Sequence, residues 1–155
     1  MRVHDAGVIV FLMILCSAAW QDLHTRSIGC RFLVISGYLG SIYSILAKRN
    51  MQDIVVSCGI GMVLLGICKL TRGGIGEGDG WFFVISGLFL DIGENLSLFF
   101  CGLLFCFLFS LPIMVMNVWK KREIGKHGLP FLLFLLPGGI WMIAEHLNLK
   151  GMIGR

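Results

Sequence analysis

The chain has 155 residues, of which 57% are hydrophobic and only 14% are charged, and its mean hydropathy is +0.87. This balance lies outside the range of soluble globular domains, and no polar stretch is long enough to fold by itself. The net charge of +4 comes from basic residues scattered over short loops, which argues against nucleic-acid binding. We therefore expect one all-α, membrane-embedded domain over residues 1–155.

Six apolar runs predict six transmembrane helices. The fourth run is too short to cross an average bilayer and is also compatible with a re-entrant element buried in protein. The six runs have approximate limits of Ala6–Leu23, Phe32–Ala47, Ile54–Leu70, Trp81–Ile92, Leu96–Val118 and Leu129–Ala144.

The distribution of charge favours six spans over five. With six, eight of the 13 basic residues lie on one side and five on the other, so the first side is predicted to be cytoplasmic. Lys48 and Arg49, on the other side, run against this tendency. Gly59, Gly61 and Gly66 in the third run predict close helix packing. No pair among the six cysteines has the two-residue spacer of a metal or redox motif, so we expect packing roles for them.

Asp22 and Asp79 stand out among the nine acidic residues, because they lie where apolar runs meet the side predicted to be cytoplasmic. Each has an ordinary explanation when taken alone. Asp22 is compatible with an interfacial residue beside Arg26, and Asp79 with a turn residue or a helix cap. Their shared location on one side, which was not used to assign the topology, makes both of them candidate functional residues.

The segment Gly73–Gly80 around Asp79 has five glycines in eight positions. Such a segment permits close approach of a bound chain to the backbone, so Gly76 and Gly78 are predicted to support a substrate-binding loop. A phosphate-binding loop is disfavoured, because no Gly-Lys-Ser/Thr ending follows and the preceding segment is typical of a membrane helix rather than a strand.

The sequence resembles a known family at three places. Gly76-Glu77-Gly78-Asp79 is similar to the Gly-x-Gly-Asp motif of intramembrane aspartyl peptidases. The segment from Asp22 to Ile28, Asp-Leu-His-Thr-Arg-Ser-Ile, resembles the first aspartate motif of the type IV prepilin peptidases. His127-Gly128-Leu129-Pro130-Phe131 is similar to the start of that family's final segment.

The resemblance implies a six-span peptidase of the bacterial inner membrane. Its substrate would be a type IV prepilin or pseudopilin-like precursor, from which a short basic leader is removed at the cytoplasmic face. Asp22 and Asp79 would be catalytic, and neither a cofactor nor a metal is expected. The length resembles the short members that serve Flp-type pili, without the region of longer members that methylates the product. Two positions depart from the family pattern, since Gly29 and Trp81 stand where proline and lysine are usual.

Other residues and other functions are compatible with parts of the sequence. His24 and His127 lie on the same predicted side as Asp22, but histidines on separate loops are more often interfacial than metal ligands. Glu77 and Glu123 are weak candidates for contacts with a basic leader. The alternatives are a small proton- or ion-coupled transporter using the two aspartates, and a non-catalytic membrane subunit derived from a peptidase.

Overall fold

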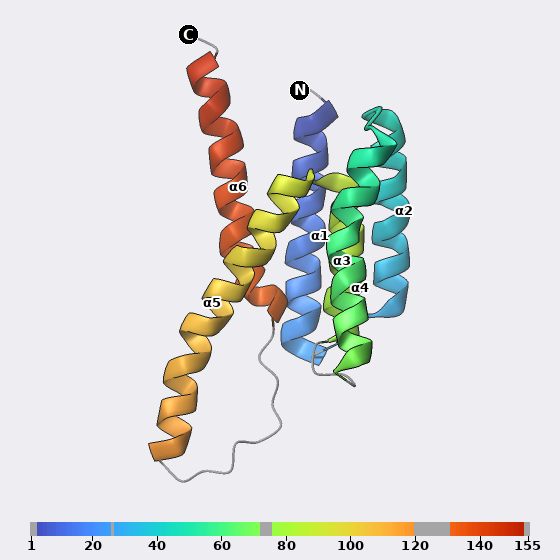
Figure 1. The fold of residues 1–155 in the computed structure, drawn as a ribbon. Helices are drawn as coiled ribbons and strands as arrows, with labels where there is room; N and C mark the ends of the chain where they lie inside the picture. The colour runs from blue at the N-terminus through green and yellow to red at the C-terminus, as the bar shows by residue number, and fades with distance from the viewer. Residues whose placement is uncertain (1–2, 26, 72–75, 120–130, 154–155) are drawn as a thin grey trace.

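The protein folds into six α-helices, and a computed structural model describes residues 3–25, 27–71, 76–119 and 131–153. Successive helices run in opposite directions, so that the described amino and carboxyl ends lie at the same end of the molecule (Figure 1). We call the opposite end, where α1 ends and α4 begins, the aspartate end. The helices are α1 (Val3–Thr25), α2 (Cys30–Leu46), α3 (Met51–Leu70), α4 (Glu77–Phe89), α5 (Ile92–Trp119) and α6 (Phe131–Ile153).

The all-helical prediction is confirmed, and each predicted span overlaps one helix, except that Ile92, the last residue of the fourth run, already begins α5. Three helices are long and apolar enough to cross a membrane, over Ala6–Thr25, Met51–Leu70 and Ile92–Pro112. Two shorter apolar helical segments cover Cys30–Leu46 and Phe131–Met142. The fourth helix begins four residues earlier than predicted, at Glu77 rather than Trp81, because the last four residues of the glycine-rich segment, which hydropathy excludes from the span, are helical.

Helix α4 is the central element of the bundle and has only 13 residues. Its three phenylalanine side chains are almost fully buried and contact three neighbouring helices. Phe82 packs on Phe11 of α1 with ring centroids 6.1 Å apart, Phe89 stacks on Tyr43 of α2 at 5.4 Å, and Phe83 meets Phe99 of α5 edge to face at 5.4 Å. Such pairs add to the apolar burial that fixes α4 among its neighbours.

The fourth side of α4 packs against α3 through glycines. A β-carbon at Gly61 of α3 would overlap the backbone nitrogen of Val84, and one at Gly87 of α4 would lie 2.5 Å from the backbone nitrogen of Cys58. The two backbones are therefore in direct contact, as small residues permit in membrane helices. The prediction for Gly59 and Gly66 was wrong, since no atom of another helix in the described part of the chain lies within 4 Å of a β-carbon at either position. These two glycines lie on another face of α3.

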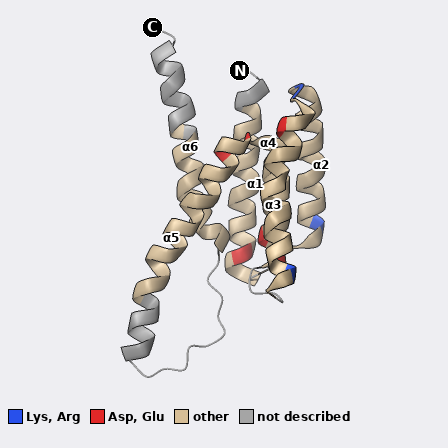
Figure 2. Ribbon diagram, in the orientation of Figure 1, with Lys and Arg blue, Asp and Glu red and all other residues tan. Residues whose placement is uncertain are grey.

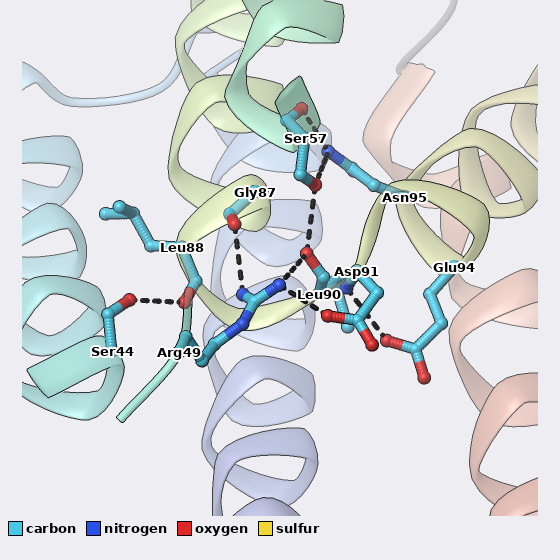
Figure 3. Close-up of polar contacts among 9 residues, drawn as sticks. All are labelled: Ser44, Arg49, Ser57, Gly87, Leu88, Leu90, Asp91, Glu94 and Asn95. Atoms are coloured by element: carbon cyan, nitrogen blue, oxygen red, sulfur yellow. Dashed lines mark hydrogen bonds and ion pairs between the residues drawn. The ribbon is translucent and has the colours of Figure 1, made fainter. Parts of the chain in front are cut away.

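Arg49 holds the carboxyl end of α4. Its guanidinium donates hydrogen bonds to the carbonyl oxygens of Gly87 (3.1 Å) and Leu90 (2.9 Å), and it forms an ion pair of 2.6 Å with Asp91 (Figure 3). Carbonyl groups in the last turn of a helix lack intrahelical donors, and a cation there is favourable. This contact gives Arg49 a structural role at the carboxyl end of α4, on the side where the charge distribution did not predict basic residues.

The turn after α2 directs Arg49 toward α4. Lys48 has a φ of 49°, in the left-handed region, and its N–H donates to the carbonyl of Ile45. The N–H of Arg49 donates to the carbonyl of Ser44 at 3.1 Å. These two bonds form a Schellman motif, which ends α2 and turns the chain sharply. Both basic residues that ran against the charge tendency thus belong to this turn.

A buried polar cluster ties α5 to α3 and α4 beside this turn. Asn95, Ser57 and Ser86 have exposed fractions of 0%. The amide nitrogen of Asn95 donates to the carbonyl of Ser57 at 3.0 Å, and its amide oxygen accepts from the hydroxyl of Ser86 at 2.7 Å. Ser57 in turn donates to the carbonyl of Leu90 (Figure 3). Because its polar atoms are paired, the cluster stabilises the bundle instead of offering a binding site.

Asn95→Ala is expected to lower the free energy of unfolding by about 2 kcal/mol, since it removes interhelical hydrogen bonds and leaves a small cavity. Thermal unfolding in detergent would measure the loss. Ser97→Ala, at an exposed position of the same helix, serves as the control and should change stability by no more than about 0.5 kcal/mol. Equal effects of the two substitutions would contradict the proposed role of the cluster.

Candidate active site

Asp22 lies near the carboxyl end of α1 and is only 9% exposed. Its Oδ2 accepts a hydrogen bond of 3.2 Å from the backbone N–H of Leu132, which belongs to the first turn of α6. N–H groups in the first turn of a helix lack an intrahelical acceptor, so a carboxylate is a favourable partner. Asp22 therefore connects the end of α1 to the beginning of a helix 110 residues further along the chain.

Asp79 lies in the first turn of α4, before the apolar part of that helix. Its N–H donates to the carbonyl of Gly76 at 3.1 Å. A β-carbon at Gly76 would lie 3.0 Å from Oδ2 of Asp79, so the carboxyl group lies beside Gly76, the residue that precedes α4. Burial, followed by the negative charge of Asp22, raises the pKa of Asp79 from 3.8 to about 7. Asp79 consequently keeps its proton at pH values where an exposed aspartate has lost it.

The fold brings Asp22 and Asp79 together, although they are far apart in the sequence. Acidic residues lie on both α1 and α4 at the aspartate end (Figure 2). The charge of Asp22 contributes to the raised pKa of Asp79, so the two carboxyl groups lie within electrostatic range of each other. Two carboxyl groups in this situation resist simultaneous ionisation and can share one proton.

The two sequence motifs that carry these aspartates also contact each other. Ile28, at the end of the first motif, packs against Gly78 of the second, and a β-carbon at Gly78 would lie 3.2 Å from its Cδ1. Gly78 is helical and half-buried there, whereas Gly76 is the exposed residue before α4. The contact fixes the segment after Asp22 against the turn that carries Asp79.

The sequence profile of the type IV leader peptidase family matches residues 9–111, which is 103 of the 155 residues and includes both aspartates. The chain belongs to the type IV leader peptidase family. The resemblance to this family is thereby confirmed, and membership indicates a peptidase that acts on a protein substrate. The family and the apolar helices together indicate a membrane protein. Comparisons with curated proteins and with solved structures found no match.

The two departures from the family pattern have different structural settings. Gly29 precedes α2 with a φ of −62°, a value that proline also adopts, and its N–H donates to Oε1 of Gln21 at 3.2 Å. A hydrogen bond donated to α1 thus restrains the turn where the peptidase family usually has proline. Trp81 is 51% exposed and lies two residues after Asp79, which places the two side chains on different faces of α4.

The other predicted residues lie around the aspartates or outside the described part. His24 is exposed and stacks on Trp20, with ring centroids 5.2 Å apart, as expected of an interfacial pair. Glu77 is exposed in the first turn of α4. The described residues contain no group of three or more His, Cys, Asp or Glu that could hold a metal ion. Glu123 and the segment from His127 to Pro130 lie outside the described residues.

Sequence reasoning missed Gln21 and Leu132. Gln21 contributes through a side-chain amide to the turn after α1, and Leu132 contributes through its backbone N–H alone. A backbone group carries no residue-type signal, and an apolar Leu132 in an apolar run predicts only packing. Leu132 lies beyond the segment that the family profile matches.

Proposed function

We propose that this protein is an aspartic endopeptidase of the bacterial inner membrane. It removes the short basic leader from type IV prepilin or pseudopilin-like precursors at the cytoplasmic face. The observation that carries the proposal is the pair of Asp22 and Asp79, in which the pKa of Asp79 is raised to about 7 beside a second carboxyl group. A shared proton on two such groups is suited to hydrolysis of an amide near neutral pH.

The proposed reaction uses one charged and one protonated carboxyl group. The charged group takes a proton from water as the water oxygen attacks the carbonyl carbon, while the protonated group gives its proton to the carbonyl oxygen. The resulting neutral diol then collapses. The first carboxyl group protonates the leaving nitrogen as the C–N bond breaks, and the second regains a proton from a diol hydroxyl. Both groups return to their starting states.

The arrangement of the helices supports six crossings with both ends outside. Six helices of alternating direction account for an even number of crossings (Figure 1). At 1.5 Å per residue, α4 is only about 20 Å long, shorter than the hydrocarbon core of a bilayer. The neighbouring helices compensate for the short length of α4, because a short helix surrounded by protein does not expose its ends to lipid.

The location of the aspartates favours cleavage at the membrane surface. Trp20 and Trp81 are 66% and 51% exposed near the two carboxyl groups, and tryptophans of this kind concentrate at the boundary between lipid and water. Cleavage there avoids unwinding a substrate helix in lipid, where each unpaired backbone group costs several kcal/mol. We therefore propose a precursor whose apolar helix docks among the spans and whose leader stays in water, with a small residue such as glycine at the cut.

Coexpression with a pilin-like precursor encoded nearby would test the function. We expect wild type to shorten the precursor, and Asp22→Asn or Asp79→Asn to leave it at full length. Asp53→Asn is the matched control, because this exposed aspartate lies in the first turn of α3 at the opposite end of the bundle. It should process the precursor normally.

Two outcomes would support the alternatives instead. A precursor left intact by wild type would favour a non-catalytic membrane subunit. Proton or cation flux in liposomes that is lost in both aspartate variants, without any cleavage, would favour a transporter. Normal processing by either aspartate variant would exclude a catalytic pair.

A further inference from the structure

The surroundings of the two aspartates differ in one respect that bears on their chemical roles. Asp22 faces the amino end of α6, whereas Asp79 lies in the first turn of its own helix against Gly76. We propose that the backbone N–H of Leu132 holds Asp22 in its charged form, so that Asp22 is the general base and Asp79 the proton donor. This assignment rests on the proposed peptidase function and extends the active site to α6.

The hydrogen bond to Leu132 favours one charge state of Asp22. A backbone N–H can only donate, so it stabilises the carboxylate more than the carboxylic acid. The first turn of α6 adds a partial positive charge at Asp22, as the first turn of α4 does at Asp79, so the N–H of Leu132 is what distinguishes the two carboxyl groups. Because Asp22 is 9% exposed, few water molecules screen this interaction. Burial raises the pKa of Asp22, and the hydrogen bond from Leu132 acts against this larger effect by lowering it. Within the described part of the chain, Asp22 is thus the one of the two carboxyl groups that accepts a hydrogen bond from a fixed donor.

The packing of α6 keeps this donor in register. A β-carbon at Gly139 would lie 2.7 Å from Cδ2 of Leu15, so α6 and α1 approach closely there. Gly139 follows Leu132 by seven residues, and Asp22 follows Leu15 by seven residues. Seven residues make about two helical turns, so in these antiparallel helices the glycine contact and the hydrogen bond lie along one seam. A shift of one turn would lose both contacts.

Aromatic packing also fixes the first turn of α6 relative to α4 and α5. Phe131 lies beside Phe83 of α4, with ring centroids 6.4 Å apart, and near Gly102 of α5. The side chain of Leu132 is fully buried. Helix α4 therefore contributes both Phe83, which packs against α6, and Asp79. The N–H donor and the second carboxyl group are therefore positioned by one set of contacts.

Other titratable groups on the neighbouring elements do not provide an equivalent interaction. From α4 the groups are Asp79 and the exposed Glu77, and the described side chains of α6, over residues 131–142, contain no titratable residue. His24 on α1 is exposed and stacked on Trp20. At the start of α2, Cys30 and Arg31 are also exposed, and on α5 the half-buried thiol of Cys106 lies within electrostatic range of Asp79. Asp79 complements the assignment, because burial is the larger cause of its raised pKa and the charge of Asp22 is the second.

Infrared difference spectroscopy on the purified protein would show which aspartate holds the proton. Raising the pH from about 5 to about 8 should remove one carboxylic-acid C=O band in wild type. We expect Asp22→Asn to show the band at low pH and to lose it as the pH rises, because burial still raises the pKa of Asp79. In Asp79→Asn this band should be missing at both pH values. The opposite pattern, with the band missing at both pH values in Asp22→Asn and present at low pH in Asp79→Asn, would overturn the assignment. This measurement does not depend on activity.

The role of the N–H itself can be tested by comparing Leu132→Pro with Leu132→Ala. Both shorten the buried side chain, but only proline removes the N–H, and proline is tolerated in the first turn of a helix. The acid limb of the kcat/KM profile should lie roughly one to two pH units higher in Leu132→Pro than in Leu132→Ala, because Asp22 is then harder to ionise.

The outcomes separate this inference from the proposed function. Coinciding acid limbs in two active variants would overturn the role of Leu132. Absence of cleavage by wild type would instead contradict the peptidase function, while the infrared spectra would still decide which aspartate is charged. If Leu132→Pro does not fold, the infrared comparison of the aspartate variants remains the deciding measurement.

Discussion

Asp79→Asn is expected to abolish precursor cleavage and, above neutral pH, to make the protein more stable than wild type. The loss of cleavage should be on the order of 1,000-fold or more, because an amide side chain cannot donate a proton and take it back during the reaction. The gain in stability has a separate origin. It comes from removing a carboxyl group that the fold holds in a partly buried position.

The direction of the stability change follows from the pKa of Asp79. Its value is about 7 in the folded protein and 3.8 for an unperturbed group, so between these values the folded state binds a proton that the unfolded state has released. The free energy of unfolding of wild type therefore falls as the pH rises from about 4 to about 7. Asparagine is neutral throughout, so the advantage of the variant grows over this range and is complete above it.

Thermal unfolding in detergent at several pH values would measure this advantage. Allowing for partial screening by solvent, we expect about 2 kcal/mol above pH 7, which corresponds to a Tm roughly 5 °C higher. Asp53→Asn should keep cleavage and show no comparable pH-dependent gain, since Asp53 is exposed. A Tm difference between Asp79→Asn and wild type that does not change from pH 4 to pH 8 would contradict the raised pKa.

Much of the fold could be predicted from the sequence, because runs of apolar residues have to be helical in a membrane. The boundary of α4 was the main exception. Hydropathy places the start of a span at Trp81, but Gly78, Asp79 and Gly80 are helical, and a β-carbon at Gly80 would lie 2.7 Å from Leu65 of α3. Polar and glycine residues that pack against protein instead of lipid are invisible to a hydropathy scale.

The candidate site could be predicted only in part. Asp22 and Asp79 were identified because charged residues near hydrocarbon require an explanation, and the structure places both at one end. The donor from Leu132 depends on where α6 begins relative to α1, and the role of Arg49 depends on the turn that aims it at α4. Such contacts are made with backbone groups across the fold, and residue types alone do not indicate them.

Gly61→Ala is expected to be among the most destabilising single substitutions in the chain, although it adds only one methyl group. Its β-carbon would overlap the backbone of Val84 and lie 2.7 Å from the carbonyl oxygen of Gly80. Backbone atoms cannot rotate away as a side chain can, so α3 and α4 would have to separate. We expect a loss of at least about 3 kcal/mol in the free energy of unfolding.

The same helix offers a matched control for this prediction. Gly59→Ala and Gly66→Ala add the same methyl group where no atom lies within 4 Å, so they should raise the free energy of unfolding by up to about 1 kcal/mol through helix propensity. Thermal unfolding and the precursor assay would be applied to all three variants. Because Gly80 adjoins Asp79, separation of α3 from α4 should also displace the second carboxyl group. Gly61→Ala is therefore expected to lose cleavage even at temperatures where it remains folded, and full activity would show that the close contact of α3 and α4 does not position Asp79.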